Sequence, residues 1–175
     1  MPLTKKATKP EVHQKFVDAL GIKVKEHSSF EEIPFKAYLK QPLPSKVRIY
    51  AYNVTHPPGG RPSGEHKAQL ILPDQDRGER ASFDHSDGYT VLLLGYTPDS
   101  DVFILWDAGL HRNFAYSKNV QVKVETVYTA LGGEIGTQTR HLQTGDETVV
   151  TANPDNLAKA LEKRVELTQQ RLMSE

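Results

Sequence analysis

The chain has 175 residues, which is enough for one domain with a hydrophobic core, and it contains no cysteine, which excludes disulfides, thiolate metal sites and a cysteine nucleophile. Its 22 basic and 22 acidic residues give zero net charge, less basic than most nucleic-acid-binding proteins. No apolar run approaches the roughly 20 residues of a membrane span, and no signal peptide is evident, so we expect a cytoplasmic protein with no membrane partner.

The first predicted element is a helix from Lys9 to about residue 20. Thr8 is suited to cap its amino end, and Gly21 follows its last apolar residue as a stop signal. The next stretch, up to Ser45, contains three prolines. It is predicted to be an extended connection without regular structure.

The middle of the chain carries strand patterns. Residues 47–53 alternate as a half-buried strand, and a second strand is expected at 68–72, after a Pro- and Gly-rich loop. Residues 89–96 and 102–106 are predicted to form a hairpin. Their continuous apolar runs indicate strands that are covered on both faces.

The last third of the chain mixes strands and helices. A strand at 120–124 and a short helix at 125–133 are expected, and residues 137–142 and 147–151 are predicted to pair around a turn. Asn153 and Pro154 are typical of a helix start, so a closing helix follows to about residue 172. The fold class is therefore mixed α/β but mainly β, with short strands and long loops that favour a closed or half-closed barrel over a parallel sheet.

Charge is unevenly distributed along this neutral chain. Residues 33–64 and 108–124 contain no Asp or Glu but several Lys and Arg residues. A positive field that is local in sequence can also be local in space, and phosphate groups respond to the local field. These two segments therefore predict a polyanion-binding surface.

Side chains suited to DNA contacts gather in these segments and beside them. Arg can bind guanine with two hydrogen bonds, Asn and Gln can do the same to adenine, and Lys suits phosphates. The candidates in the first loop are Arg61, His66, Lys67 and Gln69, and those in the second are Arg112, Asn113, Tyr116, Ser117, Lys118 and Asn119. Arg77 and Arg80 are further candidates, although local ion pairs with Asp76 and Glu79 are expected for them. The competing interpretation is two ordinary surface loops.

Two other functions stay open. Asp107, Gln121 and Lys123 resemble a variant nuclease metal motif, which would make the chain a magnesium-dependent nuclease, but a second carboxylate is missing. The chain could instead be a protein-interaction domain that binds a partner through its Pro-rich loop. Residues 84–87 are expected to form a turn. Seven histidines without metal-ligand spacing predict no metal site, and we expect no cofactor.

The run from Ser63 to Pro73 resembles the DNA-binding effector domain of certain type II restriction endonucleases, which shares a B3-like pseudobarrel with a plant DNA-binding domain. Residues 91–96 and 102–106 are similar to the central hairpin of that family. The resemblance covers about residues 50–125. It implies an open seven-stranded pseudobarrel that presents two loops to the major groove, with flanking helices at about 9–20 and 154–172 and a core at about 46–152.

Carried over by position, the first arm is Thr55–Gln69, and the second is either 76–86 or 111–119, of which we prefer the acid-free 111–119. We therefore predict a single domain that recognises a specific sequence in double-stranded DNA and has no catalytic activity of its own. The resemblance implies that cleavage belongs to a separate nuclease domain, possibly in the same full-length chain. The prediction requires that the two arms lie side by side.

Overall fold

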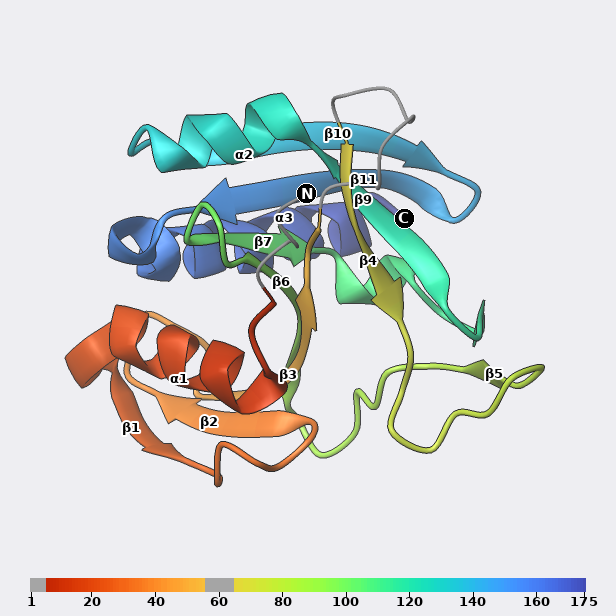
Figure 1. Cartoon of the computed structure of the whole chain (residues 1–175), viewed down its shortest axis with the longest axis horizontal. Helices are drawn as coiled ribbons and strands as arrows, with labels where there is room; N and C mark the ends of the chain where they lie inside the picture. The colour runs from red at the N-terminus through yellow and green to blue at the C-terminus, as the bar shows by residue number, and fades with distance from the viewer. Residues whose placement is uncertain (1–5, 56–64) are drawn as a thin grey trace.

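The computed structural model describes residues 6–55 and 65–175, and its centre is a seven-stranded sheet with the order β1-β2-β3-β6-β7-β11-β10 (Figure 1). β3 and β6 are parallel neighbours, whereas the other neighbours are antiparallel. The strands of this sheet are β1 (Val24–His27), β2 (Phe35–Leu39), β3 (Lys46–Asn53), β6 (Thr90–Thr97), β7 (Val102–Trp106), β10 (Gly136–Leu142) and β11 (Gly145–Ala152).

Two short two-stranded sheets accompany it. β4 (Glu65–Leu70) pairs with β9 (Lys118–Lys123), and β5 (Arg80–Ala81) pairs with β8 (Phe114–Ala115). Both pairs lie on the right of the view in Figure 1, away from β1 and β2 on the left. The predicted first arm and both candidates for the second arm therefore meet in one part of the molecule, over the residues that the structure describes.

Both faces of the large sheet are covered. On one face, α1 (Lys9–Leu20) and α3 (Leu157–Ser174) pack with β2, β3, β6, β7 and β11 in one apolar cluster. On the other face, the β4–β9 pair and α2 (Val124–Leu131) form a second cluster. Every residue of β7 is buried as a result, which confirms the prediction that this strand is covered on both sides.

The helix ends follow the predicted signals. Thr8 and Glu11 form a capping box at the start of α1, and Gly21 ends the helix with a φ of 57°. The side chain of Asn153 accepts a hydrogen bond from the amide of Asn156 before α3 begins. Within the two described ranges, no helix is long and apolar enough to span a membrane.

The mainly-β class, the seven strands and the flanking helices are confirmed, but the sheet is open and does not close into a barrel, because β1 and β10 remain its edges. The extended connection expected before Ser45 was wrong, since β1 and β2 form there. Pro34 and Pro42 lie outside β2 rather than within it, and Phe35, Ala37 and Leu39 bury alternate side chains. The sheet therefore begins well before the predicted core boundary at 46.

Gly95 of β6 allows the single tryptophan to pack against the sheet, and we predict that Gly95→Ala destabilises the protein. A Cβ at this position would lie 2.5 Å from Val54 Cγ2 and 2.7 Å from Trp106 Cζ3. Overpacking of this kind costs about 1–3 kcal/mol in the free energy of unfolding, measurable by urea denaturation. Gly132→Ala is the matched control, because its nearest contacts are ordinary at 3.5 Å. Equal stability of the two variants would contradict the close packing.

Candidate nucleic-acid interface

The β4–β9 pair, which we call the ribbon, has one apolar and one polar face. In both strands side chains alternate, so that Ala68, Leu70, Val120 and Val122 are buried against the large sheet. His66 also lies on this inward face and is 5% exposed. His66, which was predicted to contact DNA, therefore lies beneath the ribbon and not on its outward face.

The outward face of the ribbon is a row of polar cross-strand pairs. Glu65 lies opposite Lys123, Lys67 opposite Gln121, and Gln69 opposite Asn119. The side chains of these six residues are exposed or half-buried. β4 and β9, about 50 residues apart in sequence, thus form one continuous surface of amides, ammonium groups and the carboxylate of Glu65. The described parts of segments 55–69 and 111–119 lie side by side, as the prediction required.

Gln121 and Lys123 also lie in the outward row, and the DNA-contact prediction did not include them. Their spacing after Asp107 had suggested a nuclease motif instead. The available signal was the alternation in 118–123, which places Asn119, Gln121 and Lys123 on one face. What the sequence did not reveal was the register with β4, which sets each of them opposite a polar partner.

A second patch surrounds the short β5–β8 pair. Arg80 lies opposite Ala115, and a groove runs between residues 77–80 and 115–117. Arg77 and Arg80 are exposed, and neither forms an ion pair with any residue in the described part of the chain. The expected local ion pairs with Asp76 and Glu79 are therefore wrong, and both guanidinium groups face solvent beside the ribbon.

Of the remaining predicted contacts, Tyr116 and Ser117 occupy the turn between β8 and β9, whereas Arg112 and Asn113 precede β8. Tyr116 and Ser117 are half-buried there, and Ser117 has a φ of 63°. Asn113 and Arg112 are exposed, and the φ of 47° at Asn113 explains an asparagine by backbone conformation alone. Arg61 lies outside the described residues.

A hydrogen bond anchors the ribbon to the large sheet. The indole Nε1 of Trp106 donates to the carbonyl oxygen of Gln121 over 2.9 Å. Because Trp106 is 1% exposed, this bond is shielded from water and difficult to replace. The ribbon is therefore held at its centre, at the residue whose side chain belongs to the outward row.

A buried polar network supports the turn that follows β8. His111 and Glu147 are both almost fully buried, and His111 Nε2 lies 2.6 Å from Glu147 Oε2. Lys118 Nζ lies 3.3 Å from His111 Nδ1. An ammonium can only donate, so Lys118 donates to Nδ1 of the ring, and Nε2 faces the Glu147 carboxylate. Burial lowers the pKa of Lys118, and its charge is turned inward rather than toward solvent.

The Asp107 carboxylate forms hydrogen bonds and ion pairs that the nuclease hypothesis did not predict. Its carboxylate accepts hydrogen bonds from Arg171 Nε at 2.7 Å and Arg171 Nη2 at 3.1 Å, and Arg164 Nη2 lies 3.5 Å away. Gly109 donates its amide to the same carboxylate. These contacts occupy both oxygens, so the carboxylate on which the magnesium site depended is bound to arginine.

Metal ligands do not gather elsewhere either: across residues 6–55 and 65–175, no group of three or more His, Cys, Asp or Glu residues could hold a metal ion. Residues 84–87 form the predicted turn, in which Asp84 Oδ1 accepts from the Ser86 amide at 2.9 Å. The described surface thus offers hydrogen bonding and charge, which are the means of recognition.

Comparison with known proteins gives one result. A protein-family model described as Methylase-associated X1 matches residues 45–161, which is about two thirds of the chain and includes the ribbon, the β5–β8 pair and the buried network. No curated protein and no solved structure matches. The match links the chain to methylases and hence to restriction-modification systems, and it does not confirm a B3-like fold.

We predict that Asp107→Asn lowers the free energy of unfolding by about 3–5 kcal/mol at pH 7, because it removes the carboxylate that pairs with the buried Arg164 and the half-buried Arg171. Burial alone would raise the pKa of Asp107, but the hydrogen bonds and charges of Arg171 and Arg164 outweigh it and hold the pKa below the ordinary 3.8. The stabilisation is therefore fully present above pH 3.8 and is lost as the pH falls through the lowered pKa.

Urea denaturation of both proteins across this pH range measures the effect. The difference between them should be constant from pH 7 to about pH 5 and shrink in stronger acid. Asp99→Asn is the control, because Asp99 is exposed in the turn between β6 and β7. A difference that grows as the pH falls would contradict the assignment.

Proposed function

This chain belongs to the methylase-associated X1 family, and we propose that it is a sequence-specific double-stranded DNA-binding domain of a restriction-modification system. The observation that carries the proposal is the outward row of the ribbon, in which amide and ammonium side chains lie opposite one another on a rigid, anchored pair of strands. The family supplies the biological setting, and the ribbon supplies the chemistry of recognition.

The ribbon fits a known kind of groove reader. The major groove of B-form DNA admits a two-stranded β-ribbon, and Gln and Asn pair with adenine through two hydrogen bonds. Gln69, Asn119 and Gln121 supply three such amides on neighbouring positions of the two strands. In this proposal they read base edges, and the residues beneath the ribbon keep its outward face in place.

Cations around the ribbon would supply phosphate contacts. Lys67 and Lys123 lie within the row, and Arg77 and Arg80 extend the positive surface through the β5–β8 pair. Glu65 lies opposite Lys123 and leaves that end of the row less positive than its centre at Lys67, which favours one orientation of the duplex. A local cluster of this kind is compatible with a chain of zero net charge.

The proposal assigns recognition to this domain and the chemical step to another. The carboxylate that a nuclease site would have used is bound by Arg171 and Arg164. A methylase, or a nuclease domain in the same full-length chain, would modify or cut the DNA that this domain selects.

The proposal is tested by selection from a random duplex library at fixed salt, followed by sequencing of the bound fraction. We expect an enriched short sequence. Equal recovery of all sequences would remove the base-reading claim, and recovery of none would remove DNA binding itself.

We predict that Lys67→Ala and Lys123→Ala weaken binding to all duplexes alike. Each substitution removes one phosphate contact, so the slope of log Kd against log salt concentration should fall by about 0.9 per variant. Fluorescence anisotropy at several salt concentrations measures the slope. Lys25→Ala in β1 is the matched control, because this exposed lysine lies on the far edge of the sheet. An unchanged slope in the ribbon variants would place the phosphates elsewhere.

We predict that Gln69→Ala and Asn119→Ala relax sequence preference instead. Loss of a bidentate amide should cost about 1–3 kcal/mol on the selected sequence and little on random duplex, because it affects one base pair. The measurement is the ratio of the two Kd values for each variant. Gln170→Ala on the exposed side of α3 is the control. Equal losses on both duplexes would show that these amides position the protein without reading bases.

A further inference from the structure

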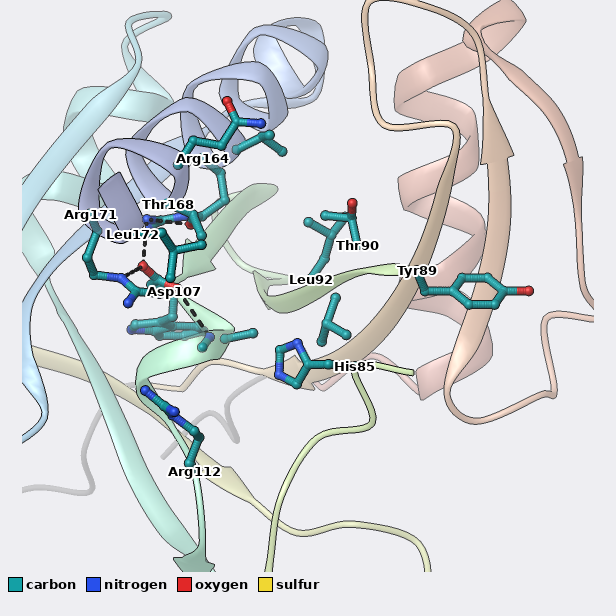
Figure 2. A pocket seen from close by; sticks show the side chains of 16 residues that line it. His85, Tyr89, Thr90, Leu92, Asp107, Arg112, Arg164, Thr168, Arg171 and Leu172 are labelled. Carbon is teal, nitrogen blue, oxygen red and sulfur yellow. Dashed lines mark hydrogen bonds and ion pairs between the residues drawn. The ribbon is translucent and has the colours of Figure 1, made fainter. Parts of the chain in front are cut away.

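A cavity of about 400 Å³ lies between α3, the start of β6 and the loop that precedes it, and it is separate from the ribbon surface (Figure 2). This volume is within the range of about 300–1,000 Å³ that small-ligand sites occupy. Its walls include apolar side chains that remain open to solvent: Val91 is half-exposed in an otherwise buried strand, and Leu172 is 56% exposed. The sole tryptophan, Trp106, also lines it.

The floor of the cavity is formed by ion-paired side chains. Asp107 and Arg171 face each other there, with Arg164 beside them, as Figure 2 shows. Since the carboxylate oxygens are occupied, these groups shape the cavity without requiring a charged ligand. Thr90, Thr168 and Gln169 add hydroxyl and amide groups to the walls. No hydrogen bond of the Gln169 side chain occurs within the described residues, so its amide can serve a ligand.

The opening of the cavity carries His85 and Arg112 (Figure 2). Arg48 holds the loop of His85 in place: its Nη1 donates to the carbonyl oxygens of Asp84, at 2.5 Å, and Ser86, at 3.2 Å. Burial, together with the charge of Arg112, holds the pKa of His85 below its ordinary value, so the ring is neutral at pH 7. Arg112 is the exposed cation at this edge, and it immediately follows His111 of the network that supports Lys118.

We propose that this cavity binds one nucleotide, with its base between the apolar walls and its phosphate at Arg112. A nucleobase is flat, mostly apolar on its faces and polar at its edges, which matches the apolar side chains of Val91 and Leu172 with the amide of Gln169 beside them. The inference rests on the proposed function in one respect: in a DNA-binding domain the nucleotide can come from the duplex, turned out of the helix, as well as from solution.

The emission of Trp106 reports occupancy directly. The full chain is titrated with each deoxynucleoside 5′-monophosphate and with the corresponding nucleosides. We expect a saturable change in emission with at least one monophosphate. Gln169→Phe, which fills the cavity without adding a tryptophan, should weaken that affinity by about tenfold or more. Gln170→Phe, its neighbour outside the cavity, should not. Arg112→Ala should weaken binding of the monophosphate and leave binding of the nucleoside unchanged.

A second experiment identifies the source of the bound nucleotide. The duplex obtained by selection carries 2-aminopurine at successive positions, and its fluorescence is followed together with binding by anisotropy. A rise at one position that Gln169→Phe abolishes, with duplex affinity measured in parallel, assigns the base to the DNA. A saturable response to monophosphates without such a rise assigns a free nucleotide.

Absence of both signals, or signals that Gln169→Phe leaves unchanged, would overturn the cavity assignment. The two proposals fail separately. Duplex binding without either signal would remove only the cavity, and a monophosphate response without duplex binding would remove only the DNA-binding function.

Discussion

The junction at Trp106 and Asp107, where β7 ends, holds the ribbon, the sheet and α3 together. The indole of Trp106 donates to the backbone of the ribbon, the amide of Asp107 donates to Glu147 over 3.0 Å, and the Asp107 carboxylate binds Arg171. Trp106 and Asp107 thus point to opposite faces of the sheet. Trp106 holds the ribbon on one face, and Asp107 holds α3 on the other. The outward row of the ribbon has a defined position because this junction does.

The junction explains why so many charged groups are buried in a small, neutral domain. Burying an ion pair often stabilises a fold no more than apolar residues of the same volume would. Glu147, Arg164 and Asp107 nevertheless sit almost fully inside, and each contacts the segment that leads into β8 and β9 or the helix behind it. The hydrogen bonds and ion pairs of these charged groups are directional, whereas apolar packing is not. They therefore fix the orientation of the ribbon and its outward row. Lys118 is directed toward this interior set through His111, so its charge is not part of the outward row of the ribbon.

Much of the fold could be predicted from local patterns. The capping signals at Thr8 and Gly21 and the apolar run in 102–106 act over a few residues, and the structure follows them. The strand at Phe35–Leu39 was missed because nearby prolines outweighed a clear alternation. The parallel pairing at the centre of the sheet was missed for a different reason. β3 and β6 join segments about 40 residues apart, and no local pattern reports a pairing of that kind.

The site could be predicted in its composition but not in its arrangement. The acid-free segment 108–124 includes Lys123, but Lys67 lies outside both acid-free segments, and only the register between β4 and β9 sets Lys67 against Gln121. The same register places Gln121 and Lys123 in the outward row of the ribbon. Their spacing after Asp107 had suggested a metal site instead. Asp107 points toward α3, whereas Gln121 joins the ribbon through its carbonyl contact with Trp106. Residues that look like one motif along the chain are therefore divided between two faces of the sheet.

The separation of Asp107 from the ribbon bears on how a domain of zero net charge could recognise a specific DNA sequence. Affinity from phosphate contacts grows with the number of free cations and is independent of sequence. A surface with few free cations and several fixed amides shifts the balance toward contacts that depend on base identity, provided that the amides are held in register. In this chain the anchored ribbon meets that condition, and the cavity beside it lies behind the same junction. Rigidity, rather than net charge, is the physical property on which recognition by this fold would depend.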